Sequence, residues 1–230
     1  MTPTIGPRPL RDSYREQLDS VVADLVEMSQ LICAAVRNAT AALLNADLQL
    51  SEQVISDDGR IDDMHADIEM RCFDLLARQA PVAGELRTVV AALRMVTEMG
   101  RMGDLAAHVA KVARMRYPDR ALPQSLESNF TRMAEVAEEM VEQAGKTLRT
   151  RNIAVARELA EIDEEMDDLR RTQFRILLGN DWPYGVEAAV DVALLGRYYE
   201  RIADHAVSMG RRLIYVVTGE IGGIDTWTQA

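Results

Sequence analysis

The chain has 230 residues and a formal net charge of −11, and hydrophobic residues make up 48% of it. This composition is typical of globular proteins and argues against disorder. Aromatic residues reach only 5%, whereas Ala, Leu, Val, Met, Glu and Arg dominate, which favours helices over the strands of sandwiches and barrels. The acidic balance argues against a nucleic-acid-binding protein, because contacts to phosphate backbones need a basic surface.

Signals for secretion, membrane insertion and disulfide formation are not found in the sequence. The first ten residues are proline-rich and lack an apolar core, so we expect no secretory signal peptide. No uncharged apolar run approaches the roughly 18 residues that a membrane helix needs. Cys33 and Cys72 fall in helix-like runs, which predicts two reduced thiols in the core or at its edge. We therefore expect a cytoplasmic protein.

The first half of the chain predicts three long helices. Residues 1–12 are expected to form a flexible tail. Apolar residues at helical spacing then predict a helix over about residues 13–44 and a second over about 51–78. A third is expected to open just after Pro81 and to reach about Tyr117, because the proline that follows blocks its continuation.

The second half repeats this plan. A helix is predicted over about residues 125–150, with Ser125 as its N-cap, and the next helix is expected to end at about Leu178. A Gly-Asn-Asp-Trp-Pro turn follows, and the last helix is predicted over about residues 184–218 with a glycine C-cap at 219. Residues 221–230 are expected to form a tail.

The two halves share residues at a nearly constant separation of about 101 positions, which indicates an internal repeat. Residues 61–63 (Ile-Asp-Asp) correspond to residues 162–164 (Ile-Asp-Glu). After one deleted residue, 101–104 (Arg-Met-Gly-Asp) correspond to 201–204 (Arg-Ile-Ala-Asp). We therefore predict an all-α, elongated fold of two tandem three-helix bundles. The first repeat is expected over residues 13–117 and the second over residues 122–220.

Two carboxylates in the last helix are candidate cation ligands. Glu200 and Asp204 are four residues apart and share one helix face, where like charges destabilise a helix by about 0.2–0.5 kcal/mol unless they are neutralised. Nearby arginines or a divalent or ferric cation could neutralise them, and the spacing leaves both alternatives open. The matching stretch of the first repeat keeps Asp104, but Gly100 replaces the glutamate, and Glu98 lies on another side of the helix.

Other chemistries find little support in the sequence. No glycine-rich phosphate loop of the nucleotide-binding kinds is present, and the nearest approach to a di-iron motif is a single Asp62-x-x-His65. The chain has only 3 histidines, which leaves little for acid–base or nucleophilic catalysis. We therefore expect that the protein is not an enzyme. A phosphotransfer bundle that uses His108 or His205 is a further alternative.

Several segments resemble signatures of the PhoU family of phosphate-signalling regulators. Residues 75–87 (LLARQAPVAGELR) resemble its helix-turn-helix stretch. Residues 101–106 and 200–206 resemble its paired Glu-Arg-Ile-(Gly/Ala)-Asp motifs, and residues 216–220 look like its C-terminus. The resemblance covers about residues 11–220, and the excess of Arg over Lys looks closest to actinobacterial members.

The resemblance implies a cytoplasmic, non-enzymatic negative regulator of the phosphate-starvation response. It implies an adaptor that links the ATPase subunit of the phosphate ABC transporter to the phosphate sensor histidine kinase, with membrane contact only through these complexes and no nucleic-acid partner. It also implies a homodimer. Some members hold metals on Glu/Asp-x-x-x-Asp motifs, which Glu200 and Asp204 match fully and which the first repeat matches only at Asp104.

Two sets of candidate site residues follow. The candidate metal ligands, for iron, zinc, magnesium or manganese, are Glu200, Asp204, Asp104 and Glu98. The residues that we expect in a charged, partner-binding face are Arg101, Arg197, Arg201 and His205. The alternative function is a helical metal-binding or storage protein with Asp/Glu oxygen ligands. Metal stoichiometry separates the two functions, because storage needs many ions per chain.

Overall fold

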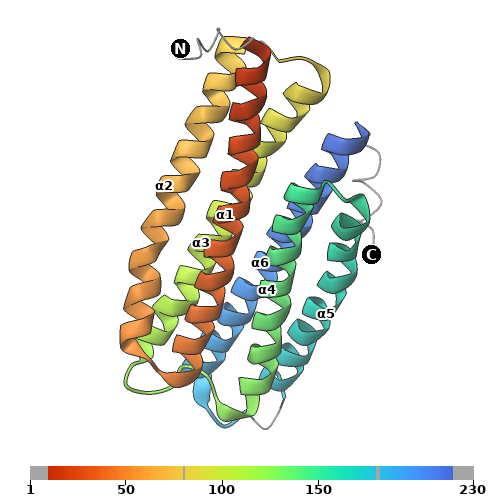
Figure 1. The fold of residues 1–230 in the computed structure, drawn as a ribbon. Helices are drawn as coiled ribbons and strands as arrows, with labels where there is room; N and C mark the ends of the chain where they lie inside the picture. The colour runs from red at the N-terminus through yellow and green to blue at the C-terminus, as the bar shows by residue number, and fades with distance from the viewer. Residues whose placement is uncertain (1–9, 80, 180–181, 220–230) are drawn as a thin grey trace, which may run out of the picture.

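The computed structural model describes residues 10–79, 81–179 and 182–219, and six long helices contain almost all of them (Figure 1). None of the described helices is long and apolar enough to cross a membrane. The elements in chain order are α1 (Leu10–Asn45), α2 (Leu48–Gln79), α3 (Ala83–Arg116), the 3-10 helix η1 (Gln124–Leu126), α4 (Glu127–Thr150), α5 (Ile153–Leu177) and α6 (Gly185–Thr218).

The predicted helices are confirmed, with small differences at their ends. α1 begins at Leu10, so the last three residues of the predicted flexible tail are helical instead. Ser125 is not the N-cap of α4, because it lies within η1, where the Leu126 amide donates to the Pro123 carbonyl at 2.9 Å. The rest of the predicted N-terminal tail, part of the predicted turn (180–181) and the tail at 221–230 lie outside the described residues.

Local chemistry explains where the helices begin and end. The Asp47 carboxylate accepts a hydrogen bond from the Leu50 amide at 3.0 Å in the first turn of α2. At the start of α5, the Asn152 side chain accepts from the Ala154 amide at 2.9 Å. Gly219 ends α6 with a φ of 75°, a left-handed conformation that costs glycine little, so its predicted C-cap role is confirmed.

The helices form two three-helix bundles that lie side by side (Figure 1). α1, α2 and α3 pack against one another, as do α4, α5 and α6, and the bundles meet where α1 contacts α4 and where α3 contacts α6. α3 and α6 run antiparallel, since Glu98 contacts Arg212 at 2.6 Å whereas the later Arg116 contacts the earlier Asp191 at 2.5 Å. An approximate two-fold axis therefore relates the bundles, and the predicted all-α fold is confirmed.

The core is apolar and rich in methionine, a flexible side chain that fills irregular gaps between helices. Cys72 is buried and Cys33 is half-buried, and both are free thiols, as predicted. Fully buried methionines come from both bundles and include Met28, Met99, Met102, Met133 and Met140.

Gly210 marks a close approach of α6 to α5. A Cβ at this position would lie 2.9 Å from the Ala156 carbonyl oxygen and 2.8 Å from Leu159 Cδ1, so the helices would have to move apart. We expect Gly210→Ala to lower the free energy of unfolding by about 1–2 kcal/mol in urea titrations. Gly59→Ala is the matched control, because nothing lies within 4 Å of its Cβ position. That helix-interior change is expected to stabilise by about 0.5–1 kcal/mol, and equal effects at both sites would contradict the prediction.

Candidate functional site

Two arginines contact and neutralise Glu200 in the structure. Arg170 of α5 donates through Nε to Glu200 Oε2 at 3.0 Å, and Arg197 of α6 contacts Glu200 Oε1 at 2.8 Å. Both carboxylate oxygens are thus engaged by guanidinium groups. The Arg170 side chain is only 11% exposed, so this contact lies in the packed groove between the two helices.

A buried polar network fixes Arg170. Its NH1 group donates to Gln173 Oε1 at 2.7 Å, and the Gln173 amide donates to the Val192 carbonyl of α6. The guanidinium also lies over the Phe174 ring, 4.2 Å from its centroid. Gly196 makes room for the network, because a Cβ there would lie 1.9 Å from Gln173 Oε1. Arg170 therefore has a fixed orientation towards Glu200.

Asp204 belongs to an acidic group where α5 meets α6. Burial raises the pKa of Asp163 to about 7, and the charges of Asp204, Asp167 and Glu200 act in the same direction, partly offset by Arg211. Burial, together with the Glu200 charge, also raises the pKa of Asp204. Nearby arginines therefore neutralise these carboxylates less completely than they neutralise Glu200. The carboxylates favour protonation or the approach of a cation from solution.

The first repeat has a different arrangement at the equivalent position. Asp104 contacts Arg101 at 3.2 Å, and the His65 ring lies where Gly100 leaves space, with Cγ 3.7 Å from the Cβ position of that glycine. Burial, followed by the charge of Asp104, raises the pKa of Asp58 on α2. The two repeats therefore do not form equivalent sites.

The predicted metal ligands do not gather into a metal centre. Among the residues that the structure describes, no group of three or more His, Cys, Asp or Glu side chains is placed to hold a metal ion. Glu200 is paired with arginines, Asp104 with Arg101, and Glu98 with residues of α6. In this arrangement the residues do not fit a bound metal, and the metal site stays a prediction.

Glu98 and His205 contact each other across the seam between α3 and α6. Glu98 Oε2 lies 2.7 Å from His205 Nδ1, and Arg212 donates to Glu98 Oε1 at 2.6 Å. Burial opposes ionisation of Glu98, but the hydrogen bonds from His205 and Arg212 outweigh it and lower the pKa of Glu98. Glu98, expected as a metal ligand, and His205, expected at the partner-binding face, thus form a polar contact between the bundles.

We expect Glu98→Gln to lower the free energy of unfolding by about 1 kcal/mol at pH 7, because the amide cannot replace the ionic hydrogen bonds. The unfolded chain has a pKa for Glu98 near the ordinary value of 4.5, and the folded protein has a lower one. The ionised carboxylate therefore stabilises the fold at pH values above 4.5. This contribution is lost as the pH falls through the pKa of the folded state. Urea titrations should therefore show the difference from the wild type shrinking below about pH 4.5. A difference that stays constant with pH would contradict this cause.

The three predicted partner-binding arginines are exposed. The Arg101 side chain is 65% exposed and that of Arg197 is 50% exposed, and Arg201 is also exposed. All three lie on the long helices α3 and α6 that form the seam. They therefore have the accessibility that a recognition face needs, whereas the His205 side chain is only 15% exposed.

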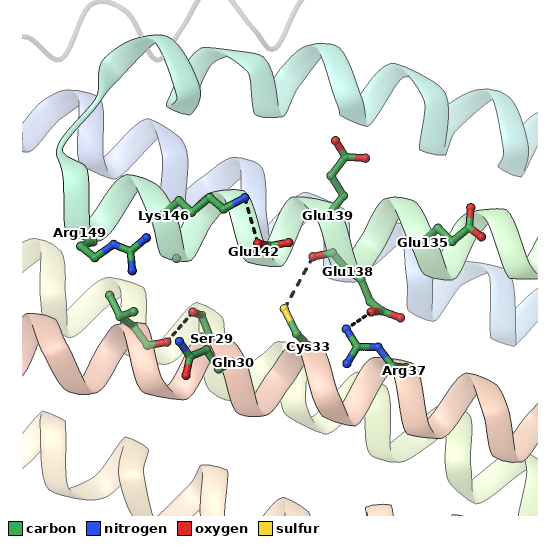
Figure 2. Close-up of a pocket in the computed structure, with 12 residues that line it drawn as sticks. Ser29, Gln30, Cys33, Arg37, Glu135, Glu138, Glu139, Glu142, Lys146 and Arg149 are labelled. Atoms are coloured by element: carbon green, nitrogen blue, oxygen red, sulfur yellow. Dashed lines mark hydrogen bonds and ion pairs between the residues drawn. The ribbon is translucent and has the colours of Figure 1, made fainter.

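An open groove of about 640 Å³ lies on the other side of the molecule, between α1 and α4 (Figure 2). Glu135, Glu139 and Glu142 of α4 line one rim, and Figure 2 shows the Arg37–Glu138 ion pair crossing from α1. Burial raises the pKa of the Cys33 thiol in this groove to about 12, so it is not a nucleophile at neutral pH.

Comparison with known proteins identifies the family. The family described as PhoU domain matches residues 25–113 and 130–213, which together make up most of the chain. The chain belongs to the PhoU family. PhoU proteins are regulatory or accessory proteins, which confirms the expectation that this chain is not an enzyme.

Relatives that are 43–48% identical to this PhoU-family chain come from mycobacteria, in agreement with the expected actinobacterial type. The chain is 48% identical over 210 residues to the "Phosphate-specific transport system accessory protein PhoU homolog 2" of Mycobacterium tuberculosis, which covers 91% of this chain and 99% of that protein. It is 46% identical over 217 residues to PhoU homolog 1 of Mycobacterium leprae, with 94% and 98% covered.

Solved PhoU structures share the fold. The crystal structure of PhoU from Pseudomonas aeruginosa matches with a TM-score of 0.84 at 27% identity, over 90% of this chain and 100% of that one. PhoU from Streptococcus pneumoniae matches with a TM-score of 0.82 at 22% identity, over 90% and 98%.

Proposed function

We propose that this chain is a negative regulator of the phosphate-starvation response. It acts as an adaptor in the cytoplasm that links the ATPase subunit of the phosphate ABC transporter to the sensor histidine kinase, and it modulates phosphate uptake. The observation that carries the proposal is the 48% identity, along almost the whole of both chains, to a protein named as an accessory of the phosphate-specific transport system.

The geometry fits an adaptor. The two bundles offer long helix faces for protein contacts, and exposed arginines project from α3 and α6. Such a protein acts by binding one state of a partner more tightly than another, so its influence on kinase output is limited by that difference in affinity. Homodimer formation stays a prediction, which light scattering of the purified protein tests.

The test is the output of a phosphate-regulated reporter, such as alkaline phosphatase, in a deletion strain grown in abundant phosphate. We expect high output that the intact gene returns to a low level. Output that stays low in the deletion strain, and also in a strain that lacks any paralogue, would contradict negative phosphate signalling.

The metal-binding or storage alternative is favoured by one observation, the raised pKa values of Asp163 and Asp204. Metal analysis of the purified protein separates the two functions, since a regulator needs few ions or none and storage needs many. Many ions per chain, retained after dialysis, would favour storage.

A further inference from the structure

α3 and α6 repeat the same pattern of exposure. Residues 91–100 and 191–200 show an identical order of buried, half-buried and exposed positions. The outward positions of α3 form a first stripe, and the equivalent positions of α6 form a second stripe. The first stripe consists of Leu86, Arg94, Thr97 and Arg101, and the second of Val186, Leu194, Arg197 and Arg201, all of them exposed.

The two stripes lie on one surface and run in opposite directions. The approximate two-fold axis relates α1 to α4 and α3 to α6, so it passes through both helix contacts, and the outer faces of α3 and α6 point the same way. α1 and α4 lie on the other side of the molecule (Figure 1). His108 of α3 and Tyr198 of α6 stack across the seam with ring centroids 5.4 Å apart, so the surface continues from one stripe to the other.

The stripes have the chemistry of a protein-binding surface. Each begins with an exposed aliphatic side chain and ends with an exposed arginine, Arg101 or Arg201. An exposed phenylalanine lies at an equivalent position of the neighbouring helix, Phe73 on α2 and Phe174 on α5. Exposed aliphatic side chains such as Leu86, Val186 and Leu194 contribute little to the packing of the fold, whereas interface centres are enriched in aromatic side chains and arginine.

The charge of the surface indicates the chemistry of the partner that it can bind. Two arginines project from each stripe of a chain whose net charge is −11. Arg101 and Arg197 also contact Asp104 and Glu200 of their own helices, but both side chains are at least half exposed and keep donors for further contacts. Carboxylates of a partner therefore complement these four arginines, whereas the groove between α1 and α4 carries four glutamates beside Arg37, Lys146 and Arg149.

We propose that the two stripes together bind a homodimeric partner protein, one partner subunit on each stripe, through apolar side chains flanked by carboxylates. A surface with approximate two-fold symmetry matches a two-fold partner, because each subunit then meets an aliphatic side chain (Leu86 or Val186) and an arginine (Arg101 or Arg201) at equivalent positions. Two linked contacts also strengthen binding beyond either contact alone. The inference rests on the proposed adaptor function, and it specifies the symmetry and chemistry of the partner.

The experiment uses this chain with the intact, detergent-solubilised sensor kinase and, separately, the intact phosphate transporter complex. Native mass spectrometry gives the stoichiometry, and interferometry gives the dissociation constants. The variants are Arg101→Glu and Arg201→Glu, singly and together, and Arg149→Glu on α4 is the control with the same change of charge on the opposite side. Circular dichroism melting checks that each variant is folded.

We expect two partner subunits per copy of this chain for at least one of the two complexes. Each single variant should weaken that binding about tenfold and by a similar factor, the double variant about a hundredfold, and the control less than twofold. An effect confined to one repeat would overturn the inference in favour of an asymmetric partner. Variants that change only self-association would overturn it in favour of a second copy of this chain. If the intact chain binds neither complex, the adaptor function fails, and the inference fails with it.

Discussion

Arg170→Met is expected to lower the free energy of unfolding by about 3 kcal/mol, because it leaves the half-buried Glu200 carboxylate with one guanidinium partner instead of two. The same change removes the donor to Gln173 Oε1, the oxygen that occupies the space beside Gly196. Urea titrations at pH 7, followed by circular dichroism, measure the loss.

Arg171→Met is the matched control one position along α5. Its partner is Asp168, and both side chains are more than 60% exposed, so we expect a much smaller change than at Arg170. The double variant Arg170→Met/Glu200→Met should recover part of the loss, because it removes the uncompensated carboxylate. Equal losses at Arg170 and Arg171, or no recovery in the double variant, would show that the ion pair is not the cause.

Local signals explain why most of the helical fold was predictable. Prolines and the 3.6-residue spacing of apolar side chains depend on neighbouring residues, so they place helix ends such as those of α3 closely. The prediction of Ser125 as an N-cap failed for a local reason as well. A 3-10 turn closes between Pro123 and Leu126 and delays the α-helical start to Glu127.

The candidate site was less predictable, because its contacts join distant segments. Helical spacing places Glu200 and Asp204 on one face, but it does not show which group neutralises them. Arg170, which sequence reasoning missed, lies 30 residues away and reaches Glu200 through the packing of α5 on α6. One signal was present, since Arg170 and Gln173 continue the helical spacing of the buried stripe that contains Leu159 and Met166.

The seam between the bundles gave no sequence signal. Glu98 and His205 are 107 residues apart, and their contact depends on the position of one bundle against the other. The internal repeat predicts two similar bundles, but it does not predict their packing, because either could rotate about its long axis without changing its own core. The exposed stripes of α3 and α6 face the same way only as a result of that packing.

Asp163→Asn is expected to raise the free energy of unfolding by about 2–3 kcal/mol at pH 8. The pKa of Asp163 is raised to about 7, so the folded protein keeps this proton over a pH range in which the unfolded chain has already lost it. The wild type therefore loses stability as the pH rises from about 4 to 7, and the asparagine, which mimics the neutral acid, avoids that loss. Urea titrations at pH 5.5 and 8.0 should show the larger gain at pH 8.0.

Asp168→Asn is the control, because the Asp168 side chain is 73% exposed and contacts Arg171. We expect a small change there, and a similar pH dependence at both positions would contradict the role of the acidic group around Asp163. Divalent cations extend the experiment to the metal alternative. A cation held between Asp163 and Asp204 would favour their ionised forms, so Mg²⁺, Mn²⁺ or Zn²⁺ would raise the melting temperature of the wild type at pH 8 and leave that of Asp163→Asn unchanged. If none of these ions has this effect, the acidic group is a source of pH sensitivity and not a site for these metals.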